Sequence, residues 1–295
     1  MFEQLGVIGC GLIGGSFALA MRQRGLVRRV VGCAKSASSA DRARQLGVID
    51  LALASPAQVM AGSDIVLLAV PVSATAATLQ AVRDALGPGV LLMDAGSTKR
   101  DVVDAARRVL RERVGSFVPA HPIAGKESSG VEHADAALFD RRQVILTPLP
   151  QTRPDLVERA TRVWTAIGAQ VSTMAPEQHD AAFAAVSHLP HVLAFAYFNA
   201  ILGQPGSREM LALAGPGFRD FTRIAASDPT IWRDILGANR EEVLKQSQRF
   251  RQALEAFETA MKTDNGDALE ALIRGAAQGR SRWHIQGHGG SGTRG

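Results

Sequence analysis

Cysteine is scarce in this chain of 295 residues, which contains only two, Cys10 and Cys33. Two cysteines cannot build the disulfide framework on which many small secreted proteins depend. Each lies in an apolar stretch that is typical of a buried strand or loop. We therefore expect both thiols to be reduced and the protein to be cytoplasmic.

Long hydrophobic runs are also missing. The run from Ile65 to Val70, for example, is far short of the roughly 18 residues that a membrane span needs. The N-terminus, MFEQLGVIGCG, has no basic segment ahead of an apolar stretch and does not resemble a signal peptide. These absences predict a soluble protein with no membrane partner.

Aromatic residues make up only 5% of the chain, and its basic residues form no dense stripe. Nucleic-acid binding favours a basic surface with interleaved aromatic side chains. The formal charge of +5 comes from 33 basic and 28 acidic residues. We therefore expect no nucleic-acid partner; the small cationic excess suits an anionic ligand or an ordinary, mildly basic surface.

The length predicts two domains, and 46% hydrophobic with 21% charged residues is an ordinary globular composition. In the first 175 residues, short apolar strands alternate with helical stretches, a pattern that predicts parallel βαβ units. The strands contain LGVIG, RVVGCA, DIVLLAV and VLLMDA, and the helices between and after them are expected at Ile13–Arg24, Ser39–Leu46, Ala74–Leu86 and Arg100–Val114. Further elements are expected at Ser116–Pro119 (strand), Gln143–Thr147 (strand), Asp155–Ile167 (helix) and Ala169–Thr173 (strand).

From Pro176 onward the pattern is helical. Phe183–Leu202 is apolar on almost every side, which predicts a helix buried within the domain or against a second subunit. Glu241–Lys262 is amphipathic, and Asp267–Glu270 has the spacing of a capping box that opens a last helix. We predict an N-terminal α/β domain over residues 1–175, an all-helical domain over 176–280 and a disordered Gly- and Ser-rich tail over 281–295.

A glycine motif, Gly9-Cys-Gly11-Leu12-Ile13-Gly14, follows the first strand and opens the first helix. The three glycines permit a tight turn, a close approach of the backbone to a pyrophosphate, and close helix–strand packing. This context predicts a Rossmann-type, doubly wound parallel sheet. Gly9, Gly11, Leu12, Ile13 and Gly14 are all expected to contact a dinucleotide. The alternative is a glycine turn that binds nothing.

The second strand lacks the acidic residue that usually binds the adenosine ribose, and Ala34 occupies its place. A carboxylate there would repel a 2′-phosphate, whereas Lys35, Ser36 and Ser38 provide charge and hydroxyl donors. The sequence therefore favours NADP over NAD. In the alternative, Lys35 is a solvated loop residue and NAD binds without the acidic contact.

The carboxyl ends of the next strands should also face the cofactor. We assign Val70 and Pro71, at the end of the third strand, and Ser97, after the fourth, to this site. Five later segments carry polar side chains at specific spacings: DAGSTK (94–99), HPIAGKE (121–127), SHLPH (187–191), GFRDFTRI (217–224) and DPTIWRD (228–234).

With these motifs in this order, the chain resembles the prephenate dehydrogenase family, including its arogenate and cyclohexadienyl variants, from about residue 5 to 275. The resemblance implies oxidation and decarboxylation of a cyclohexadienol in tyrosine biosynthesis. The product is 4-hydroxyphenylpyruvate from prephenate, or tyrosine from arogenate. It also implies a homodimer formed through the helical domain.

The resemblance assigns the catalytic role to His121, which would accept the hydroxyl proton, and to Ser97, which would hydrogen-bond His121 and either the substrate hydroxyl or the nicotinamide. A neutral imidazole suits this step, because its ordinary pKa of about 6.5 is near working pH. The alternative for His121 is a histidine of the core. The resemblance also assigns Arg223 to a substrate carboxylate, which a guanidinium can bind bidentately, and His191 to the substrate.

The same resemblance places Lys126, Glu127 and His188 around the substrate. His188 and His191 also have helical metal-ligand spacing, but Pro190 lies between them and no third ligand is near, so we predict no metal.

Two features depart from the family pattern: Gly215-Pro216-Gly217 stands where many relatives have three glycines, and Lys126 replaces a small hydroxyl residue. The sequence therefore leaves open whether the substrate is prephenate or arogenate, and it does not address feedback inhibition by tyrosine. Two other functions remain possible: a β-hydroxyacid-type dehydrogenase, whose catalytic lysine has no convincing counterpart here, and a dinucleotide-sensing protein that is not an enzyme.

Overall fold

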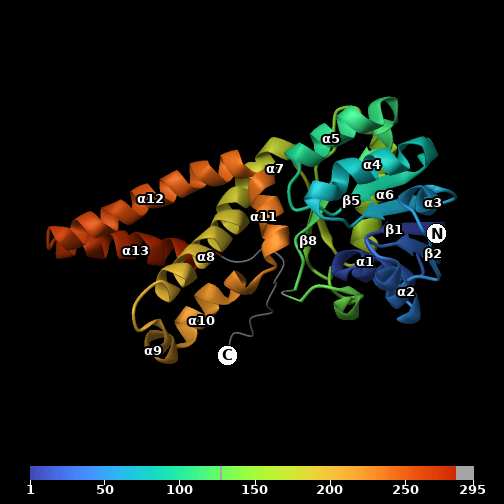
Figure 1. Cartoon of the computed structure of the whole chain (residues 1–295). Coiled ribbons are helices and arrows are strands. Elements are labelled where there is room, and N and C mark those ends of the chain that lie inside the picture. The colour runs from blue at the N-terminus through green and yellow to red at the C-terminus, as the bar shows by residue number, and fades with distance from the viewer. Residues whose placement is uncertain (127, 284–295) are drawn as a thin grey trace, which may run out of the picture.

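A six-stranded parallel sheet forms the centre of the N-terminal part in the computed structural model, which describes residues 1–126 and 128–283 (Figure 1). The strands are β1 (Phe2–Ile8), β2 (Val27–Cys33), β3 (Leu51–Ala52), β4 (Ile65–Leu68), β5 (Leu91–Asp94) and β6 (Phe117–Val118). Their order in the sheet is β3-β2-β1-β4-β5-β6, so the direction of winding changes beside β1. Open α/β sheets bind ligands at the carboxyl ends of the strands at such a change. The predicted doubly wound α/β fold is confirmed.

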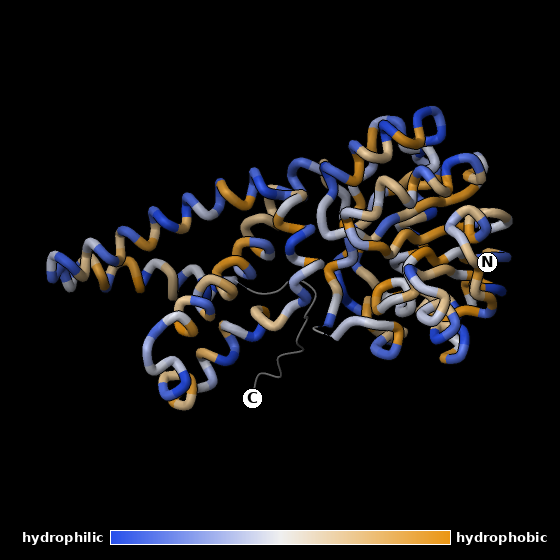
Figure 2. The backbone as a smooth tube through the Cα atoms, viewed as in Figure 1, coloured by the Kyte–Doolittle hydropathy of each residue, from blue (hydrophilic) through white to orange (hydrophobic). Residues whose placement is uncertain are grey.

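Helices cover both faces of this sheet. The strands are apolar, as their orange colour in Figure 2 shows, because alternate residues enter two different cores. In β4, Ile65 and Leu67 pack in one core, whereas Val66 and Leu68 pack in the other. The first face is covered by α1 (Leu12–Gln23), α2 (Ala37–Gln45) and α6 (Pro154–Ala166), and the second by α3 (Pro56–Met60), α4 (Thr75–Val82) and α5 (Arg100–Leu110).

A second, three-stranded sheet follows. It consists of β7 (Ala120–Pro122), β8 (Gln143–Leu146) and β9 (Gln170–Thr173), with an antiparallel β7–β8 pair and a parallel β8–β9 pair. The sequence predicted a single strand over 116–119 and did not separate this sheet from the first. Pro119 explains the break, because it has no N–H to continue the ladder of β6.

The chain is helical from Pro176 to Arg282. The helices are α7 (Pro176–Phe183), α8 (Leu189–Leu202), α9 (Ser207–Ala212), α10 (Pro216–Thr222), α11 (Pro229–Ala238), α12 (Arg240–Lys262) and α13 (Gly266–Arg282). A π-helical turn, Ala184–His188, joins α7 to α8. The last two helices form a hairpin that extends away from the rest of the molecule (Figure 1).

The continuous helical stretch Pro176–Leu202 is long and apolar enough to cross a membrane when only length and composition are considered. Its most apolar window has a mean hydropathy of 1.4 and is 28% buried. Its apolar part, Phe183–Leu202, is the segment that the sequence predicted as a helix buried within the domain or against a second subunit. A core or interface helix of a water-soluble protein has the same length and composition, and this stretch carries three buried polar side chains, His179, Asp180 and His188.

Two predictions near the C-terminus are wrong. The cap of α13 is Asn265, whose side chain accepts a hydrogen bond of 3.0 Å from the backbone N–H of Ala268, so the helix does not begin with the predicted box at Asp267–Glu270. The helix also continues to Arg282, past the predicted start of the tail at 281. The rest of that tail, residues 284–295, lies outside the described residues.

A buried ion pair joins the carboxyl end of β5 to β7. Lys99 Nζ lies 2.5 Å from Asp94 Oδ2 and donates a 2.7 Å hydrogen bond to the carbonyl oxygen of Ala120. The same carboxylate accepts from the backbone amides of Gly96 and Ala120, at 2.8 and 3.0 Å. Lys99 and Asp94 are almost completely buried. This pair fixes the segment 95–98 against the start of β7.

We predict that Lys99→Met will lower the free energy of unfolding by about 3–5 kcal/mol, because the buried carboxylate of Asp94 loses its cation. Urea denaturation measures this loss. Lys262→Met is the matched control, since Lys262 forms an exposed pair with Glu258, and it should cost less than about 1 kcal/mol. Equal effects of the two substitutions would contradict a structural role for the Asp94–Lys99 pair.

Candidate active site

The glycine loop after β1 requires glycine at two positions. Gly9 has a φ of +100°, and a Cβ atom there would lie 2.2 Å from the carbonyl oxygen of Ala69. A Cβ atom at Gly14 would lie 2.1 Å from the carbonyl oxygen of Gly9. Around Gly11, by contrast, a Cβ atom would meet nothing within 4 Å. The loop is therefore tightly packed on the side of the sheet and open on the other side.

The N-terminus of α1 is suited to an anion. Gly11 caps the helix without a side-chain hydrogen bond, and the first turn contains no acidic residue. The first backbone N–H groups of a helix have no partner within it, and the helix dipole adds positive potential there. Leu12 and Ile13, at this end, line a pocket. These features fit the pyrophosphate of a dinucleotide.

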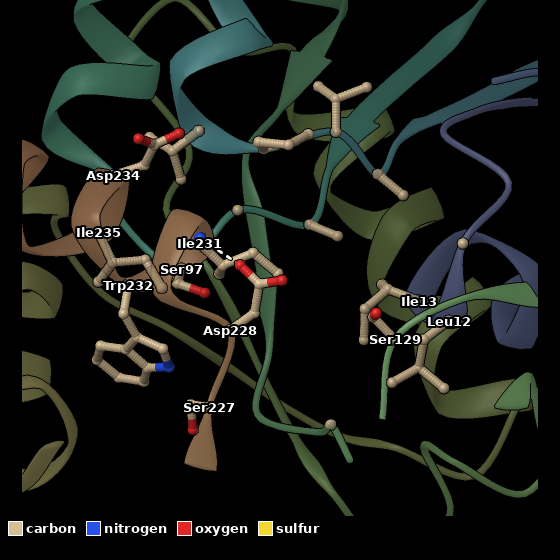
Figure 3. A pocket seen from close by; sticks show the side chains of 18 of the residues that line it. Leu12, Ile13, Ser97, Ser129, Ser227, Asp228, Ile231, Trp232, Asp234 and Ile235 are labelled. Atoms are coloured by element: carbon tan, nitrogen blue, oxygen red, sulfur yellow. Dashed lines mark hydrogen bonds between the residues drawn. The ribbon is translucent and has the colours of Figure 1, made fainter. Parts of the chain in front are cut away.

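This pocket lies between the large sheet and α11 and has a volume of about 360 Å³ (Figure 3). Leu12 and Ile13 of α1 line it from one side, and Ile231 and Trp232 of α11 from the other. Of the residues predicted from the sequence, it brings together Gly11, Leu12, Ile13, Val70, Pro71, Ser97 and Lys126. Both parts of the molecule thus build the site.

A hydrogen bond connects the two walls of the pocket. Ser73, just after the loop that follows β4, donates to Asp234 of α11 over 2.5 Å. This bond, together with one from Arg233, lowers the pKa of Asp234. It holds the cofactor side of the pocket against the helix that carries Trp232.

The end of β2 lies outside the lining of this pocket. Ala34 is half-buried there, and Lys35 and Ser36 are exposed. Ser36 caps α2 by accepting from the backbone N–H of Ser39, and its hydroxyl lies 3.0 and 2.8 Å from those of Ser38 and Ser39. Three hydroxyl groups therefore surround a helix N-terminus next to a lysine.

A buried network connects His121 of β7 to α7. His121 Nδ1 lies 2.8 Å from His179 Nε2, and His179 Nδ1 lies 2.8 Å from Asp180 Oδ1. Asp180 also accepts hydrogen bonds from the backbone amides of Lys99 and Arg100, at the start of α5. His179 and Asp180 are almost completely buried, and His121 is 8% exposed. This arrangement fixes the orientation of the His121 ring.

Burial keeps the histidines of the site uncharged. Burial, with His179, Lys99 and His188 nearby, holds the pKa of His121 well below 6.5. Burial also lowers the pKa of His188 to about 4. For His191 the effect of burial exceeds that of a hydrogen bond to Ser187, so its pKa is lowered as well. At neutral pH, His121 is a base with a free lone pair.

The SHLPH segment lies in the π-helical turn and the first turn of α8. His191 donates from Nδ1 to the carbonyl oxygen of Ser187 over 2.9 Å, and its ring stacks on Trp232 with the centroids 3.5 Å apart. The Nδ1 atom of His188 accepts from the side chain of Asn239, which also donates to the carbonyl oxygen of Asp180. His191 therefore contacts a residue of the pocket wall, whereas His188 supports the buried network.

The other predicted substrate residues are more dispersed. Lys126 lines the pocket and forms an exposed ion pair with Asp135, 3.2 Å away. Arg223 lies in the short 3₁₀ helix after α10 and is exposed, away from the pocket lining. Glu127 lies outside the described residues.

Sequence reasoning missed His179, Asp180 and the Ser73–Asp234 bond. His179 and Asp180 precede the SHLPH motif and belong to none of the motifs used above, so no spacing rule singled them out. The only local signal was the adjacent His–Asp pair itself. Within residues 1–126 and 128–283, no group of three or more His, Cys, Asp or Glu residues is arranged to hold a metal ion.

A dinucleotide loop, a pocket between a doubly wound sheet and a helical part, and a buried neutral histidine whose segment continues into the wall of that pocket at Ala124 together define a nicotinamide-dependent dehydrogenase. Comparison with known families is more specific. Residues 17–173 match the nucleotide-binding domain of prephenate dehydrogenase, and residues 175–275 match the dimerization domain of the same enzyme. The chain belongs to the prephenate dehydrogenase family.

Individual relatives agree with this assignment. The chain is 34% identical to the cyclohexadienyl dehydrogenase of Zymomonas mobilis, over 91% of this chain and 92% of that protein. It is equally similar, at 34%, to the prephenate dehydrogenase of Bacillus subtilis, over 91% of this chain and 73% of that protein. The structure of Aquifex aeolicus prephenate dehydrogenase with hydroxyphenyl propionate and NAD+ superimposes with a TM-score of 0.89 at 34% identity, covering 95% of this chain and 98% of that one.

Proposed function

We propose that this protein oxidises and decarboxylates prephenate to 4-hydroxyphenylpyruvate in tyrosine biosynthesis. The ring carbon that bears the hydroxyl loses a hydride, and the ring carboxylate leaves as carbon dioxide. The electron pair of the broken C–C bond makes the ring aromatic, and the hydroxyl remains as a phenol. A nicotinamide bound in the pocket would accept the hydride. The alternative substrate is arogenate, which would give tyrosine directly.

The observation that carries this proposal is the uncharged imidazole of His121, in the segment that leads into the dinucleotide pocket. Its segment continues into the pocket wall at Ala124. A neutral imidazole can accept the hydroxyl proton while the hydride leaves, whereas an imidazolium cannot. Ser97, also in the wall, is proposed to hydrogen-bond His121 and either the substrate hydroxyl or the nicotinamide.

The remaining substrate contacts are proposed from the family resemblance. Arg223 would bind a carboxylate of the substrate, because a guanidinium and a carboxylate form two parallel hydrogen bonds. His191, stacked on Trp232, would contact the substrate from the helical side. Lys126 in the pocket wall adds a cation, which suits the dianion prephenate. The other two proposed neighbours of the substrate are Glu127 and His188.

The β-hydroxyacid alternative is less well supported. Such enzymes typically use a lysine on the helical side. The lysines of the helical part are Lys245 and Lys262, and both are exposed on α12 and paired with Glu242 and Glu258.

The proposed chemistry predicts that His121→Asn will lower kcat by about 10²–10⁴-fold, the usual contribution of a positioned base. Initial rates with prephenate and arogenate, each with NAD and NADP, measure the effect and identify the substrate. His133→Asn is a matched control, because His133 is exposed at the end of a short 3₁₀ helix and its side chain should be dispensable. Near-normal turnover by His121→Asn would remove His121 from the mechanism.

For the cofactor, we propose NADP in preference to NAD. The support is the group of Ser36, Ser38 and Ser39 at the N-terminus of α2 next to exposed Lys35, with Ala34 in place of an acidic residue. Hydroxyl donors, a cation and a helix N-terminus suit a 2′-phosphate. NAD remains the alternative, since the Aquifex aeolicus relative was crystallised with it.

If Lys35 contacts the 2′-phosphate, Lys35→Ala should lower kcat/KM for NADP by about 10-fold, the lower end of a hydrogen bond to a charged group. The value for NAD should hardly change and serves as an internal control. Steady-state kinetics with both cofactors makes the comparison. A wild-type preference for NAD would refute the proposed specificity.

We also propose a cytoplasmic homodimer, with a division into domains near residue 175. Support for the dimer comes from the match of residues 175–275 to a dimerization domain and from exposed apolar side chains on the helices. These are Tyr197, Leu202, Phe221, Leu254 and Met261. A partner covering this surface would explain why the apolar stretch Pro176–Leu202 is so little buried. The buried free thiols of Cys10 and Cys33 suit a reducing compartment.

Sedimentation equilibrium should give twice the mass of one chain, 31.3 kDa. Leu254→Asp would place a charge on the apolar surface of α12 and should shift the population toward monomer, whereas Glu255→Asp on the same helix should not. A wild-type mass of one chain at micromolar concentration would contradict the dimer.

A further inference from the structure

The buried network determines which nitrogen of His121 carries a proton. The pKa of Asp180 is lowered, because hydrogen bonds from His179 and from the amides of Arg100 and Lys99 outweigh the effect of burial, which raises it. Asp180 is therefore an ionised carboxylate, which only accepts hydrogen bonds. His179 must donate to it from Nδ1.

The same reasoning extends to the next contact. Burial keeps the pKa of His179 below its ordinary value, although the hydrogen bond to Asp180 raises it, so the ring is neutral. A neutral ring with its proton on Nδ1 has a lone pair on Nε2. His121 must then donate to that lone pair from Nδ1, and its own Nε2 is left as the free acceptor.

We propose that His179 and Asp180 are positioning residues for this reaction: they hold His121 in the tautomer with a lone pair on Nε2 and receive its positive charge during turnover. This inference rests on the proposed function. When Nε2 of His121 accepts the hydroxyl proton, the proton on Nδ1 moves to Nε2 of His179. His121 is then neutral again, and the positive charge lies on His179, hydrogen-bonded to the carboxylate of Asp180.

The proton balance of the reaction suits a network that ends in a buried carboxylate. Loss of hydride and of carbon dioxide leaves a phenol, so the hydroxyl proton that His121 removes must return to the same oxygen. No net proton is released to solvent. Asp180 is 1% exposed and is held by two backbone amides, so the network can store a proton and return it.

The surroundings favour charge on His179 over charge on His121. The groups that affect the pKa of His121 are His179 of α7, Lys99 before α5 and His188 of the π-helical turn, and all of them disfavour its protonation. Around His179, Asp180 and Asp94 favour protonation and oppose the effects of burial and Lys99. The positive charge is therefore more stable on His179 than on His121, the residue that accepts the proton of the substrate.

Asp180→Asn tests the proposal, because it keeps the size of the side chain and removes its charge. We expect kcat with prephenate to fall at least about 10-fold. The acid limb of the profile of kcat/KM against pH should also move to lower pH. Without the carboxylate, the protonated forms of His121 and His179 are less stable, so both rings take up a proton only at lower pH. Asp155→Asn, at the exposed N-terminus of α6, is the matched control and should change neither quantity.

A reduced kcat with an unmoved acid limb would indicate a merely structural role and would overturn the proposal. A second measurement needs no variant and no turnover. In ¹⁵N NMR of the histidine-labelled wild-type protein, with signals assigned by His121→Asn, His121 should be protonated on Nδ1 and unprotonated on Nε2. The opposite tautomer would overturn the inference. If the wild type does not oxidise prephenate or arogenate, the proposed function fails, but the tautomer is still determined.

Discussion

The carboxylate of Asp94 is the contact on which the rest of the site depends. It binds the ammonium group of Lys99 and the amides of Gly96 and Ala120, and thereby fixes the segment with Ser97 against the strand with His121. The backbone of the same lysine donates to Asp180, which orients His179. One buried ion pair thus positions side chains from β5, β7 and α7. A buried charge is costly to leave unpaired, so an arrangement of these three elements that separates Asp94 from Lys99 is unfavourable.

Much of this architecture follows from short-range rules. The unbroken apolar strands and the glycine motif predicted a doubly wound sheet, since strands covered on both faces need no polar residues and only glycine fits at Gly9 and Gly14. Ser97, Val70 and Pro71, which the sequence assigned to the cofactor site, line the pocket. Capping patterns in the sequence predicted the start of α13 less well, because two caps compete there. The side chain of Asn265 accepts from the amide of Ala268, so the helix begins ahead of the capping box that starts at Asp267.

What the sequence could not provide are contacts between residues far apart in the chain. His121 and His179 are 58 positions apart, and Ser73 and Asp234 are 161 apart, so no periodicity within a helix or strand brings them together. The apolar stretch Pro176–Leu202 was ambiguous for a related reason. Its composition is the same whether a core, a second subunit or a lipid bilayer covers it, and only its position beside the buried network limits the choice.

The hydrogen bond between Ser73 and Asp234 has a thermodynamic consequence. It couples the loop that faces the cofactor to the helix that carries Trp232. If a bound cofactor favours one spacing of the two walls, this contact lets it change the affinity of the pocket for the substrate. Reciprocity then requires the substrate to change the affinity for the cofactor by the same factor. The affinity for each ligand in the presence of the other therefore depends on this contact.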